Sequence, residues 1–535
     1  MMVYLRGYSF SKTTRLLFVL ISIFTGKASF SQHAVTIKSE PGEVWWGGAV
    51  SQSHQAPFGA AKFETDLNYD NKGNQAQPLL ISNQGRVIWS ENPFAFSFSD
   101  GAITISDYTA PIVQQKSGST LRDAYLYASK TYFPPSGKTP DTTLFTEPQW
   151  NTWIELTYNQ NQTDILKYAQ NVLNNGFKPG VLMIDDTWQE DYGVWNFHPG
   201  RFPDPAAMMK QLHDMGFKLM LWICPFVSAD AVPYRELRDK KGLLRDTTGE
   251  PAMIHWWNGV SAVLDLTNPV DTEWFSSQLQ SLQDKFAVDG FKFDAGDSYF
   301  YKANTVSSKK VSPNEQTSLF GELGLKFPLN EYRAMWKMGG QPIAERIADK
   351  NHTWEDLQKL IPQSVTQGLE GYPFVCPDMI GGGDFGSFLN RSTLDEELVV
   401  RSAQCHALMP MMQFSVAPWR VLDSAHLKAV KKAVALRNAR LPLIMQLVNE
   451  AARTGEPVVR HMEYVFPNQG FVNVKDQFML GNNLLVAPMV DKGNTRTVML
   501  PKGKWKGDDN KLYRGSTKIT ISVPIDRIPY FEKIN

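Results

Sequence analysis

The sequence predicts an α/β fold, namely a (β/α)8 TIM barrel flanked by an N-terminal and a C-terminal β-sandwich domain. Three observations lead to this prediction. Apolar runs typical of buried strands alternate with helical patterns over about 300 residues. Before and after that region, apolar residues alternate with polar ones at a period of two. The length of 535 residues also fits one large barrel with smaller companions, at roughly 150 residues per domain.

The first residues, 1–31, are expected to form a secretory signal peptide. Three basic residues precede an apolar run at 16–24, and Ser29 and Ser31 supply the small residues that signal cleavage requires. This run is much shorter than the roughly 20 apolar residues of a membrane span. We therefore expect an exported protein, periplasmic or extracellular, without a membrane span.

The N-terminal β-sandwich domain is predicted over residues 32–145. Its clearest signal is the alternation of Phe94, Phe96 and Phe98 with small polar residues, followed by a turn at 100–101 and renewed alternation at 103–105. This pattern indicates a β-hairpin. The whole segment to about Thr143 is interpreted as strands.

The barrel is predicted over residues 146–450. Asp204 is a good N-cap and Pro205 a good first helical residue, which marks the start of one helix. The expected strands cover 180–184, 217–223, 290–294, 372–376 and 408–412, and expected helices cover about 165–172, 205–215, 272–285, 353–369 and 396–405. From about 458 the period of two returns, so residues 451–535 are predicted to form the C-terminal β-sandwich domain.

The composition narrows the class of ligand. Lys and Arg together number 54, as do Asp and Glu, so the chain carries no net charge and lacks the basic balance of nucleic-acid-binding proteins. Aromatic residues make up 12%, with 15 Trp, which is compatible with a flat neutral ligand such as a sugar. The three Cys show no disulfide spacing and the nine His no metal-type pairing, so neither a metal nor another cofactor is expected.

Acidic residues follow several of the predicted strands. Asp185 and Asp186, Asp294 and Asp378 all stand where an apolar run ends, which in a barrel is the catalytic face. A group of carboxylates without metal ligands or a nucleophilic Ser or Cys fits glycoside hydrolysis. For any single Asp the alternative is a helix N-cap.

Four segments carry a resemblance to a known family. Residues 197–205 (FHPGRFPDP), 352–357 (HTWEDL), 371–375 (GYPFV) and 476–488 resemble glycoside hydrolase family 31, the α-glucosidase-like retaining enzymes. The resemblance implies a retaining exo-α-glycosidase that works by double displacement. It also implies that the loop at 45–48 (WWGG) of the N-terminal domain reaches the active site.

The resemblance also implies roles for individual residues. Asp294 matches the nucleophile, and Asp349 matches the acid/base, for which we expect a raised pKa. Arg333, 16 residues before Asp349, matches a sugar-binding arginine. Asp185 matches a residue that bonds hydroxyls of the −1 sugar. Asp378 matches a buried acidic residue near the acid/base and is counted among the substrate-binding residues. Retention requires the two catalytic carboxyl groups to be about 5–5.5 Å apart.

Departures from the family pattern point to a particular branch. Lys292 stands where α-glucosidases have a Trp, Ser415 falls near a sugar-contacting His, and glycines fill 381–383. Lys292 and the Asp185–Asp186 pair are similar to the branch that includes the animal myogenesis-regulating glycosidase, which the resemblance associates with α-galactosides. The three residues are suited to grip an axial 4-hydroxyl, and Lys292 is equally suited to keep Asp294 ionised.

Trp188 follows the Asp pair directly and is the residue we favour for stacking on the sugar. Trp222 lies inside an apolar run and fits a place in the core as well as a place in the site. Trp256 and Trp257 fit either residues that line the rim of the site or residues that only anchor it. The expected partner is a small neutral oligosaccharide or glycoside. α-Glucosidase or α-xylosidase activity, transglycosylation, and a non-catalytic sugar-binding role remain as alternatives, and the oligomeric state stays open.

Overall fold

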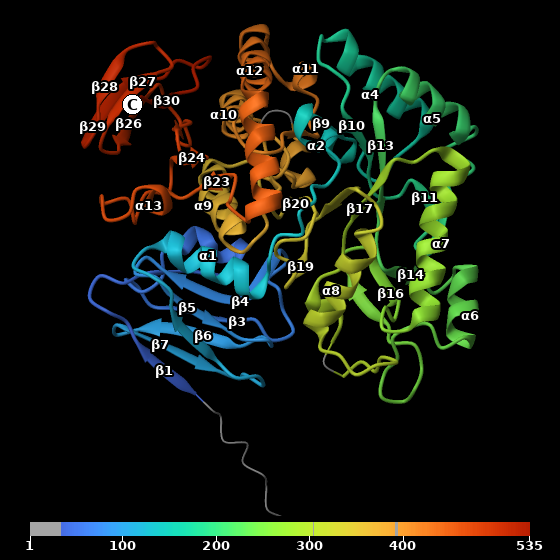
Figure 1. The fold of residues 1–535 in the computed structure, drawn as a ribbon. Helices are drawn as coiled ribbons and strands as arrows, with labels where there is room; N and C mark the ends of the chain where they lie inside the picture. Colours follow the sequence, from blue (N-terminus) through green and yellow to red (C-terminus); the bar gives the residue numbers. More distant parts are fainter. Residues whose placement is uncertain (1–33, 303, 391–393, 535) are drawn as a thin grey trace, which may run out of the picture.

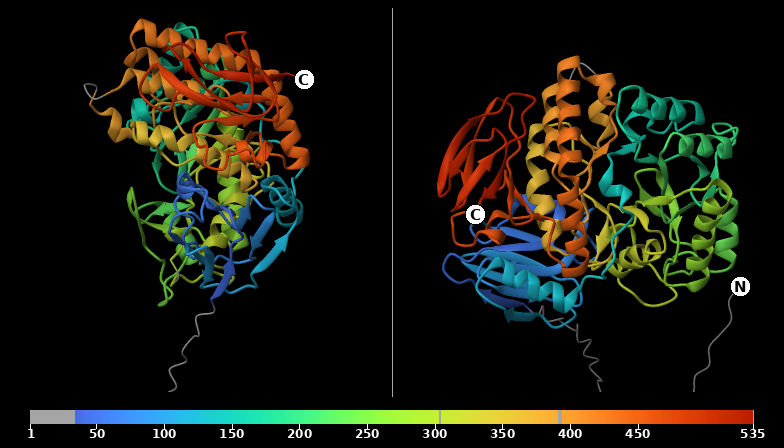
Figure 2. Two further views of the ribbon diagram at one scale, coloured as in Figure 1. Left: turned by 90° about the vertical axis from the view of Figure 1, so that its left-hand side faces the viewer. Right: turned by 45° about the horizontal axis from the view of Figure 1, so that its top comes forward.

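The computed structural model describes residues 34–302, 304–390 and 394–534. The predicted signal peptide lies outside the described residues. A central barrel carries the N-terminal sheets (blue) and the C-terminal sheets (red) on the same side, as Figures 1 and 2 show. On that side lie α9 (Trp354–Leu369), α10 (Glu396–His406) and the long α12 (Ser424–Thr454).

The barrel contains eight strands, and every pair of neighbours is parallel. An isolated parallel bridge between Met379 and Gln413 links the two ends of the sheet and nearly closes it. The predicted barrel is therefore confirmed. Its strands, in spatial order, are β21 (Val375–Cys376), β20 (Glu345–Arg346), β18 (Leu329–Tyr332), β17 (Gly290–Phe293), β13 (Lys218–Ile223), β10 (Val181–Ile184), β9 (Gln149–Asn151) and β22 (Gln413–Phe414).

Helices cover the outside of the barrel and begin where the sequence places their caps. The Asp204 side chain accepts a hydrogen bond of 3.0 Å from the backbone N–H of Ala207, and Pro205 is the first helical residue, as predicted. Besides α9 and α10, the covering helices are α4 (Gln162–Asn174), α5 (Pro205–Asp214), α7 (Pro269–Phe286) and α8 (Pro313–Gly324).

One predicted barrel strand is misplaced. Residues 408–412 form turns and irregular backbone, and the strand β22 begins only at Gln413. Pro410 has no backbone N–H to donate to a sheet. The carbonyl groups of Met409 and Pro410 accept hydrogen bonds from the buried guanidinium of Arg437 on α12, at 2.6 and 2.5 Å, and so take no part in a ladder.

The N-terminal region contributes strands to two sheets that share one apolar core, and its own strands pair with one another antiparallel. The predicted hairpin is confirmed as β6 (Ala95–Ser99) and β7 (Ala102–Ser106), joined by Asp100 and Gly101, both with positive φ. The interpretation of this region as strands alone is wrong for α1 (Leu121–Tyr132), a helix that starts with a capping box formed by Thr120 and Asp123. The other strands are β1 (Val35–Lys38), β2 (Trp45–Ala49), β3 (Phe63–Asp66), β4 (Gln75–Ser82), β5 (Arg86–Trp89) and β8 (Val113–Lys116).

The barrel and the N-terminal region share a sheet. Strand β19 (Met335–Trp336), in the loop after β18, pairs in parallel with β4, with Met335 opposite Gln75 and Trp336 opposite Ala76. Every residue of β4 is buried. This pairing brings the start of β4 to the ends of the barrel strands.

The C-terminal region contains a six-stranded sheet and a two-stranded sheet around a small core that includes Trp505 and Phe531. The predicted boundary at 450/451 falls inside α12, which ends at Thr454. Within 34–302, 304–390 and 394–534, no helix has both the length and the apolarity needed to cross a membrane. The strands of the region are β23 (Val459–Arg460), β24 (Phe478–Leu480), β25 (Leu484–Val486), β26 (Thr495–Leu500), β27 (Lys504–Gly507), β28 (Leu512–Arg514), β29 (Thr517–Ser522) and β30 (Tyr530–Ile534).

Candidate active site

A cavity of about 410 Å³ lies at the carboxyl ends of the barrel strands. Six of the eight residues predicted for the site line it, which are Asp185, Asp186, Lys292, Asp294, Arg333 and Asp349. They follow or belong to β10, β17, β18 and β20, so the parallel register brings together residues that are far apart in the sequence. Asp378 and Trp188 do not line this cavity.

Asp294, the predicted nucleophile, is fixed by three neighbours. Arg333 Nε donates to its Oδ1 at 2.9 Å, Trp222 Nε1 donates to its Oδ2 at 3.0 Å, and Lys292 Nζ lies 3.9 Å from Oδ2. Burial opposes ionisation of this carboxyl, but the positive charges of Arg333 and Lys292 outweigh it and lower the pKa of Asp294. Asp294 is therefore ionised and held in one orientation.

Lys292 bridges two carboxylates on the floor of the cavity. Its ammonium group donates to Asp185 Oδ2 at 2.8 Å, and both side chains are almost completely buried. Burial disfavours the charged ammonium, but the attraction of Asp185 and Asp294 outweighs it and raises the pKa of Lys292. Lys292 thus stays protonated and compensates the two negative charges.

Asp349, the predicted acid/base, shares one guanidinium with Asp378. Arg346 Nη1 lies 2.5 Å from Asp349 Oδ1 and 2.8 Å from Asp378 Oδ1. The Asp349 side chain is 44% exposed and open to the cavity, whereas Asp378 is buried and also accepts from the backbone N–H groups of Lys350 and Gly383. Asp378 is thus buried next to Asp349, and the substrate-binding role expected for it stays a prediction.

The pKa expected for Asp349 differs from the one found. Partial desolvation in the cavity favours its neutral form, but the charge of Arg346, followed by those of Lys292 and Arg333, outweighs this effect and lowers the pKa of Asp349. Burial and the nearby Asp349 charge raise the pKa of Asp378 to about 6, against the effect of Arg346. In the free protein the raised pKa of this pair therefore belongs to Asp378.

Gly383 keeps the two carboxyl groups close to the glycine-rich loop. A Cβ atom on this residue would lie 2.6 Å from Asp349 Oδ1 and 2.8 Å from Asp378 Oδ1, closer than carbon and oxygen can approach. Glu345, a possible alternative acid, is fully buried, accepts a hydrogen bond of 2.7 Å from Gln75, and does not line the cavity. Asp349 is thus the better placed of these carboxyl groups to meet a substrate.

Asp186 anchors the hairpin of β15 (Ile254–Trp256) and β16 (Gly259–Val263). Asn258, in the turn of this hairpin, donates to Asp186 Oδ2 at 2.6 Å and to the hydroxyl of Tyr192 at 2.7 Å. Tyr158 donates to Asn258 Oδ1 at 3.0 Å. Burial and the neighbouring charge of Asp185 raise the pKa of Asp186 to about 7.

The stacking role predicted for Trp188 does not agree with its position. Its side chain is fully buried in the barrel core, and Nε1 donates to the carbonyl of Trp222 at 2.7 Å. Trp257, in contrast, is 47% exposed, lines the cavity and lies over the Arg333 guanidinium at 5.4 Å. The other aromatic residues of the cavity wall are Trp153, Tyr158, Trp222, Tyr299 and Phe385.

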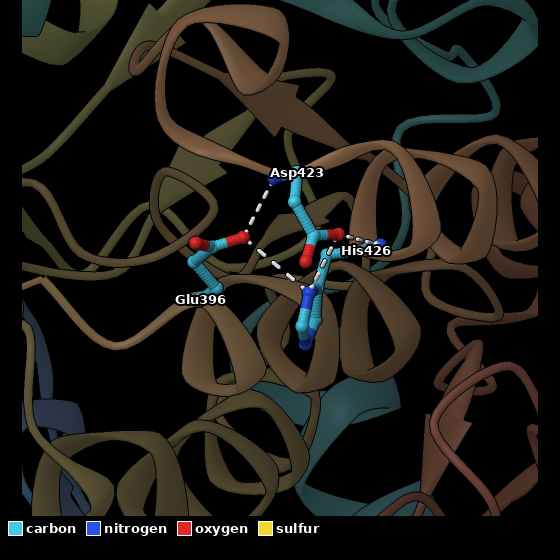
Figure 3. Close-up of side chains that lie close together, drawn as sticks. All are labelled: Glu396, Asp423 and His426. Carbon is cyan, nitrogen blue, oxygen red and sulfur yellow. Dashed lines mark hydrogen bonds and ion pairs between the residues drawn. The ribbon is translucent and has the colours of Figure 1, made fainter.

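One group of possible metal ligands occurs among the described residues, formed by Glu396, Asp423 and His426 (Figure 3). These side chains are already bonded to one another and to the start of a helix. Asp423 caps α12 by accepting from the backbone N–H of His426 at 2.8 Å, and Glu396 accepts from the backbone N–H of Asp423 at 2.7 Å. The group joins the starts of α10 and α12 and includes no carboxylate of the cavity.

Comparison with known proteins places this geometry in a family. The model of the glycosyl hydrolases family 31 TIM-barrel domain matches residues 147–339 and 339–447, and the family 31 C-terminal domain matches residues 455–535. The chain belongs to glycoside hydrolase family 31. The resemblance inferred from the sequence is thus confirmed.

Two relatives illustrate the similarity within family 31. The myogenesis-regulating glycosidase of Mus musculus is 32% identical over 77% of this chain, and α-glucosidase 2 of Bacillus thermoamyloliquefaciens is 25% identical over 77%. The chain spans 60% and 58% of the lengths of these two relatives. A family 31 dextranase from Flavobacterium johnsoniae, solved with isomaltotriose, has the same fold, with a TM-score of 0.83, 20% identity and coverage of 94% of this chain and 66% of the dextranase.

Several cavity residues were missed in the sequence. Arg346 lies three residues before Asp349, in a segment that none of the predicted strands or quoted motifs covers. Tyr299, also on the cavity wall, lies in the short 3-10 helix η2 (Ser298–Phe300), and no sequence pattern indicated it. Asn258, in the turn between β15 and β16, does not line the cavity itself but bonds Asp186 and Tyr192. The contact of Asn258 with Asp186 depends on how the hairpin of β15 and β16 folds, which is not apparent from the sequence.

Proposed function

We propose that this family 31 chain is a retaining exo-α-glycosidase that removes terminal α-linked galactose. The observation that carries the proposal is the arrangement around Asp294. An ionised carboxylate held by Arg333 and Trp222 lines the same cavity as the solvent-accessible Asp349. This combination supplies one group suited to attack and one suited to proton transfer.

In the first proposed step, Asp294 attacks the anomeric carbon and forms an ester bond. The bond from that carbon to the leaving oxygen breaks, and Asp349 gives its proton to the oxygen. Arg333 and Trp222 leave the attacking carboxylate little rotational freedom, which lowers the entropic cost of reaching the transition state.

The proton for this step comes from the Asp349–Asp378 pair. The two carboxyl groups share Arg346 and hold one proton between them below about pH 6, the pKa of Asp378. Asp349 is the member that faces the cavity, so the proton held by Asp378 passes to Asp349 before it reaches the substrate.

In the second proposed step, Asp349 acts as a base. It removes a proton from water, the water oxygen attacks the anomeric carbon, and Asp294 leaves as a carboxylate. Loss of the Asp294 charge on formation of the ester makes the positive charges nearby act more strongly on Asp349, which favours its ionised form at this stage.

The preference for galactose rests on Lys292, Asp185 and Asp186. In the proposed complex, these residues hold the axial 4-hydroxyl that distinguishes galactose from glucose. Lys292 and Asp185 are already paired at 2.8 Å, so the polar group that would accept or donate to this hydroxyl is preorganised.

Family membership also supports other substrates. The relatives include an α-xylosidase from Lactiplantibacillus pentosus and an isomaltosyltransferase from Sporosarcina globispora. A non-catalytic sugar-binding role is the alternative from another class, and one relative, from Tetronarce californica at 26% identity, is named as a SITS-binding protein.

The test is a panel of p-nitrophenyl α-glycosides carrying galactose, glucose or xylose. We expect hydrolysis of the galactoside, with the α-anomer of galactose released first, as nuclear magnetic resonance can show. Cleavage of the glucoside or xyloside alone would overturn the galactose preference, and release of the β-anomer would overturn retention.

Asp294→Ala tests catalysis itself. We expect kcat/KM to fall by at least about 10⁴-fold. Asp384→Ala, which alters another carboxylate of the same cavity, serves as the matched control and should lose much less. An unchanged rate in Asp294→Ala, or sugar binding without any turnover by the wild type, would favour the binding role.

We also propose that the protein is exported after cleavage near Ser31. Fractionation of the producing cells and N-terminal sequencing of the recovered protein test this proposal. A protein that retains Met1 or stays in the cytosol would contradict it.

A further inference from the structure

Two amide side chains of the N-terminal region reach the backbone of both cavity arginines. Asn74 Nδ2 donates to the carbonyl oxygens of Arg333 at 2.7 Å and of Arg346 at 3.2 Å. Gln75 Nε2 donates to the same two carbonyl oxygens, at 2.8 and 3.1 Å. The ends of β18 and β20 are thus joined by two neighbouring amides from another part of the chain.

The orientation of Gln75 is fixed by further contacts. Its Nε2 also donates to Glu345 Oε2 at 2.7 Å, and its Oε1 accepts from Gln367 Nε2 at 3.0 Å. Asn74 and Gln75 are both fully buried, so water does not compete for these hydrogen bonds.

The loop before β4 adds two contacts to the same region. The carbonyl oxygen of Gly73 accepts from Arg333 Nη1 at 2.7 Å. Asn71 Oδ1 accepts at 3.1 Å from the backbone N–H of Ser298, the residue after Asp297, which is the second carboxylate paired with Arg333. The loop therefore holds Arg333 by its backbone, by its guanidinium and through its ion partner.

Each of the two arginines contacts one of the two predicted catalytic carboxylates. Arg333 Nε lies 2.9 Å from Asp294 Oδ1, and Arg346 Nη1 lies 2.5 Å from Asp349 Oδ1. A shift of either arginine would change both the position and the charge environment of its carboxylate.

We propose that Asn74 and Gln75 are positioning residues of the active site. They set the relative positions of Arg333 and Arg346, and through these the placement of Asp294 and Asp349. This inference rests on the proposed function, since the placement matters for turnover only if the two carboxylates perform it.

The experiment compares Asn74→Asp and Gln75→Ala with Gln77→Ala. Asn74→Asp keeps the shape of the side chain but replaces the donor with an oxygen. Gln77 is the matched control, because it lies on the same strand, is also fully buried, and donates to the carbonyl of Glu370 instead of an arginine.

We expect Asn74→Asp and Gln75→Ala to lower kcat by about 10- to 100-fold with KM changed less than about threefold. The control should lose a similar amount of thermal stability but keep kcat within about threefold. Equal losses of kcat in Gln75→Ala and Gln77→Ala at equal melting temperature would overturn the proposal.

A structural measurement separates this proposal from the proposed function. The rates are measured on whichever glycoside the wild type cleaves, so a wrong sugar assignment does not affect the comparison. If the wild type cleaves none, crystal structures of the wild type and the three variants decide. Displacement of Arg333 or Arg346 by about 1 Å in the Asn74 and Gln75 variants alone supports positioning, and unchanged arginines overturn it.

Discussion

Lys292 and Asp185 form a buried ion pair on the cavity floor, with Nζ 2.8 Å from Oδ2. Removal of the ammonium by Lys292→Met would leave Asp185 charged and without its partner. We expect a loss of about 3–5 kcal/mol in the free energy of unfolding, measured with urea. Lys292→Met combined with Asp185→Asn should recover much of this loss, and a double variant no more stable than Lys292→Met would argue against the pair.

Asp349→Ala should affect substrates according to their leaving groups. We expect kcat/KM to fall by about 10²- to 10⁴-fold for a galactoside with a poor leaving group, because protonation of that oxygen is lost. A dinitrophenyl galactoside needs little protonation and should keep most of its first-step rate. Added azide should attack the ester at the anomeric carbon, release Asp294 and yield the α-glycosyl azide. Equal losses for both substrates would contradict the role of Asp349 as acid.

The pH dependence of kcat/KM should reflect the Asp349–Asp378 pair. The pKa of Asp378 is raised to about 6, so the pair holds its extra proton below that pH and loses it above. We therefore expect activity to decline as the pH rises through about 6. The charged groups that act on the pair are Arg346, Lys292, Arg333 and Lys350.

Asp378→Asn should move that decline. Arg346 would then pair with Asp349 alone, which lowers the pKa of Asp349 further and shifts the decline to lower pH by about one unit. The measurement is kcat/KM between pH 4 and 8 in both proteins, with circular dichroism as a control for folding. A decline at the same or a higher pH would contradict the coupling.

Trp257 rather than Trp188 should determine affinity beyond the galactose unit. Trp257→Ala is expected to raise KM for a galactosyl disaccharide by about 3- to 10-fold, the value of one stacking contact. α-Galactosyl fluoride, whose leaving group is a single atom, should be unaffected. Trp188→Phe loses the hydrogen bond to the Trp222 carbonyl and should lower stability by about 1–3 kcal/mol with KM unchanged. An unchanged KM in Trp257→Ala together with a raised KM in Trp188→Phe would show that Trp188 stacks on the sugar.

Asp271 on α7 should make stability depend on pH. Burial, with a smaller effect of the Asp265 charge, raises its pKa to about 8, and neither of its carboxyl oxygens has a hydrogen-bond partner among the described residues. The folded protein holds this proton more tightly than the unfolded chain does, so the bound proton stabilises the fold. This stabilisation is complete below about pH 4 and is lost as the pH rises to about 8.

Asp271→Asn removes this loss. We expect the variant to match the wild type near pH 4 and to exceed it by about 1–3 kcal/mol near pH 8 to 9, measured by urea denaturation. A wild type more stable than the variant at pH 8 would show that the carboxylate has a stabilising partner.

The strands made up largely of apolar residues could be predicted, and so could the acidic residues that follow them. Residues 181–184 and 290–293 form runs whose ends place Asp185 and Asp294 at the catalytic face. Strand β20 could not be found this way, because its two residues are Glu345 and Arg346. Their burial depends on partners such as Gln75, which is 270 residues distant in the sequence.

The orientation of side chains at strand ends was harder to predict than their position. Asp186 and Trp188 both follow β10, but one lines the cavity and the other fills the core. Thr187, between them, has a positive φ, which turns the chain in a way that the pattern of apolar residues does not reveal.

The pairing of β4 with β19 limits how this chain can be recombined with other proteins of family 31. A chimera made by joining one enzyme before residue 146 to the barrel of another would take β4 from one parent and β19 from the other. The boundary between the two parental sequences would then divide a sheet instead of falling in a linker. Exchangeable units in this architecture must carry both strands, so crossovers that preserve activity are expected to exchange residues 71–82 together with 329–336.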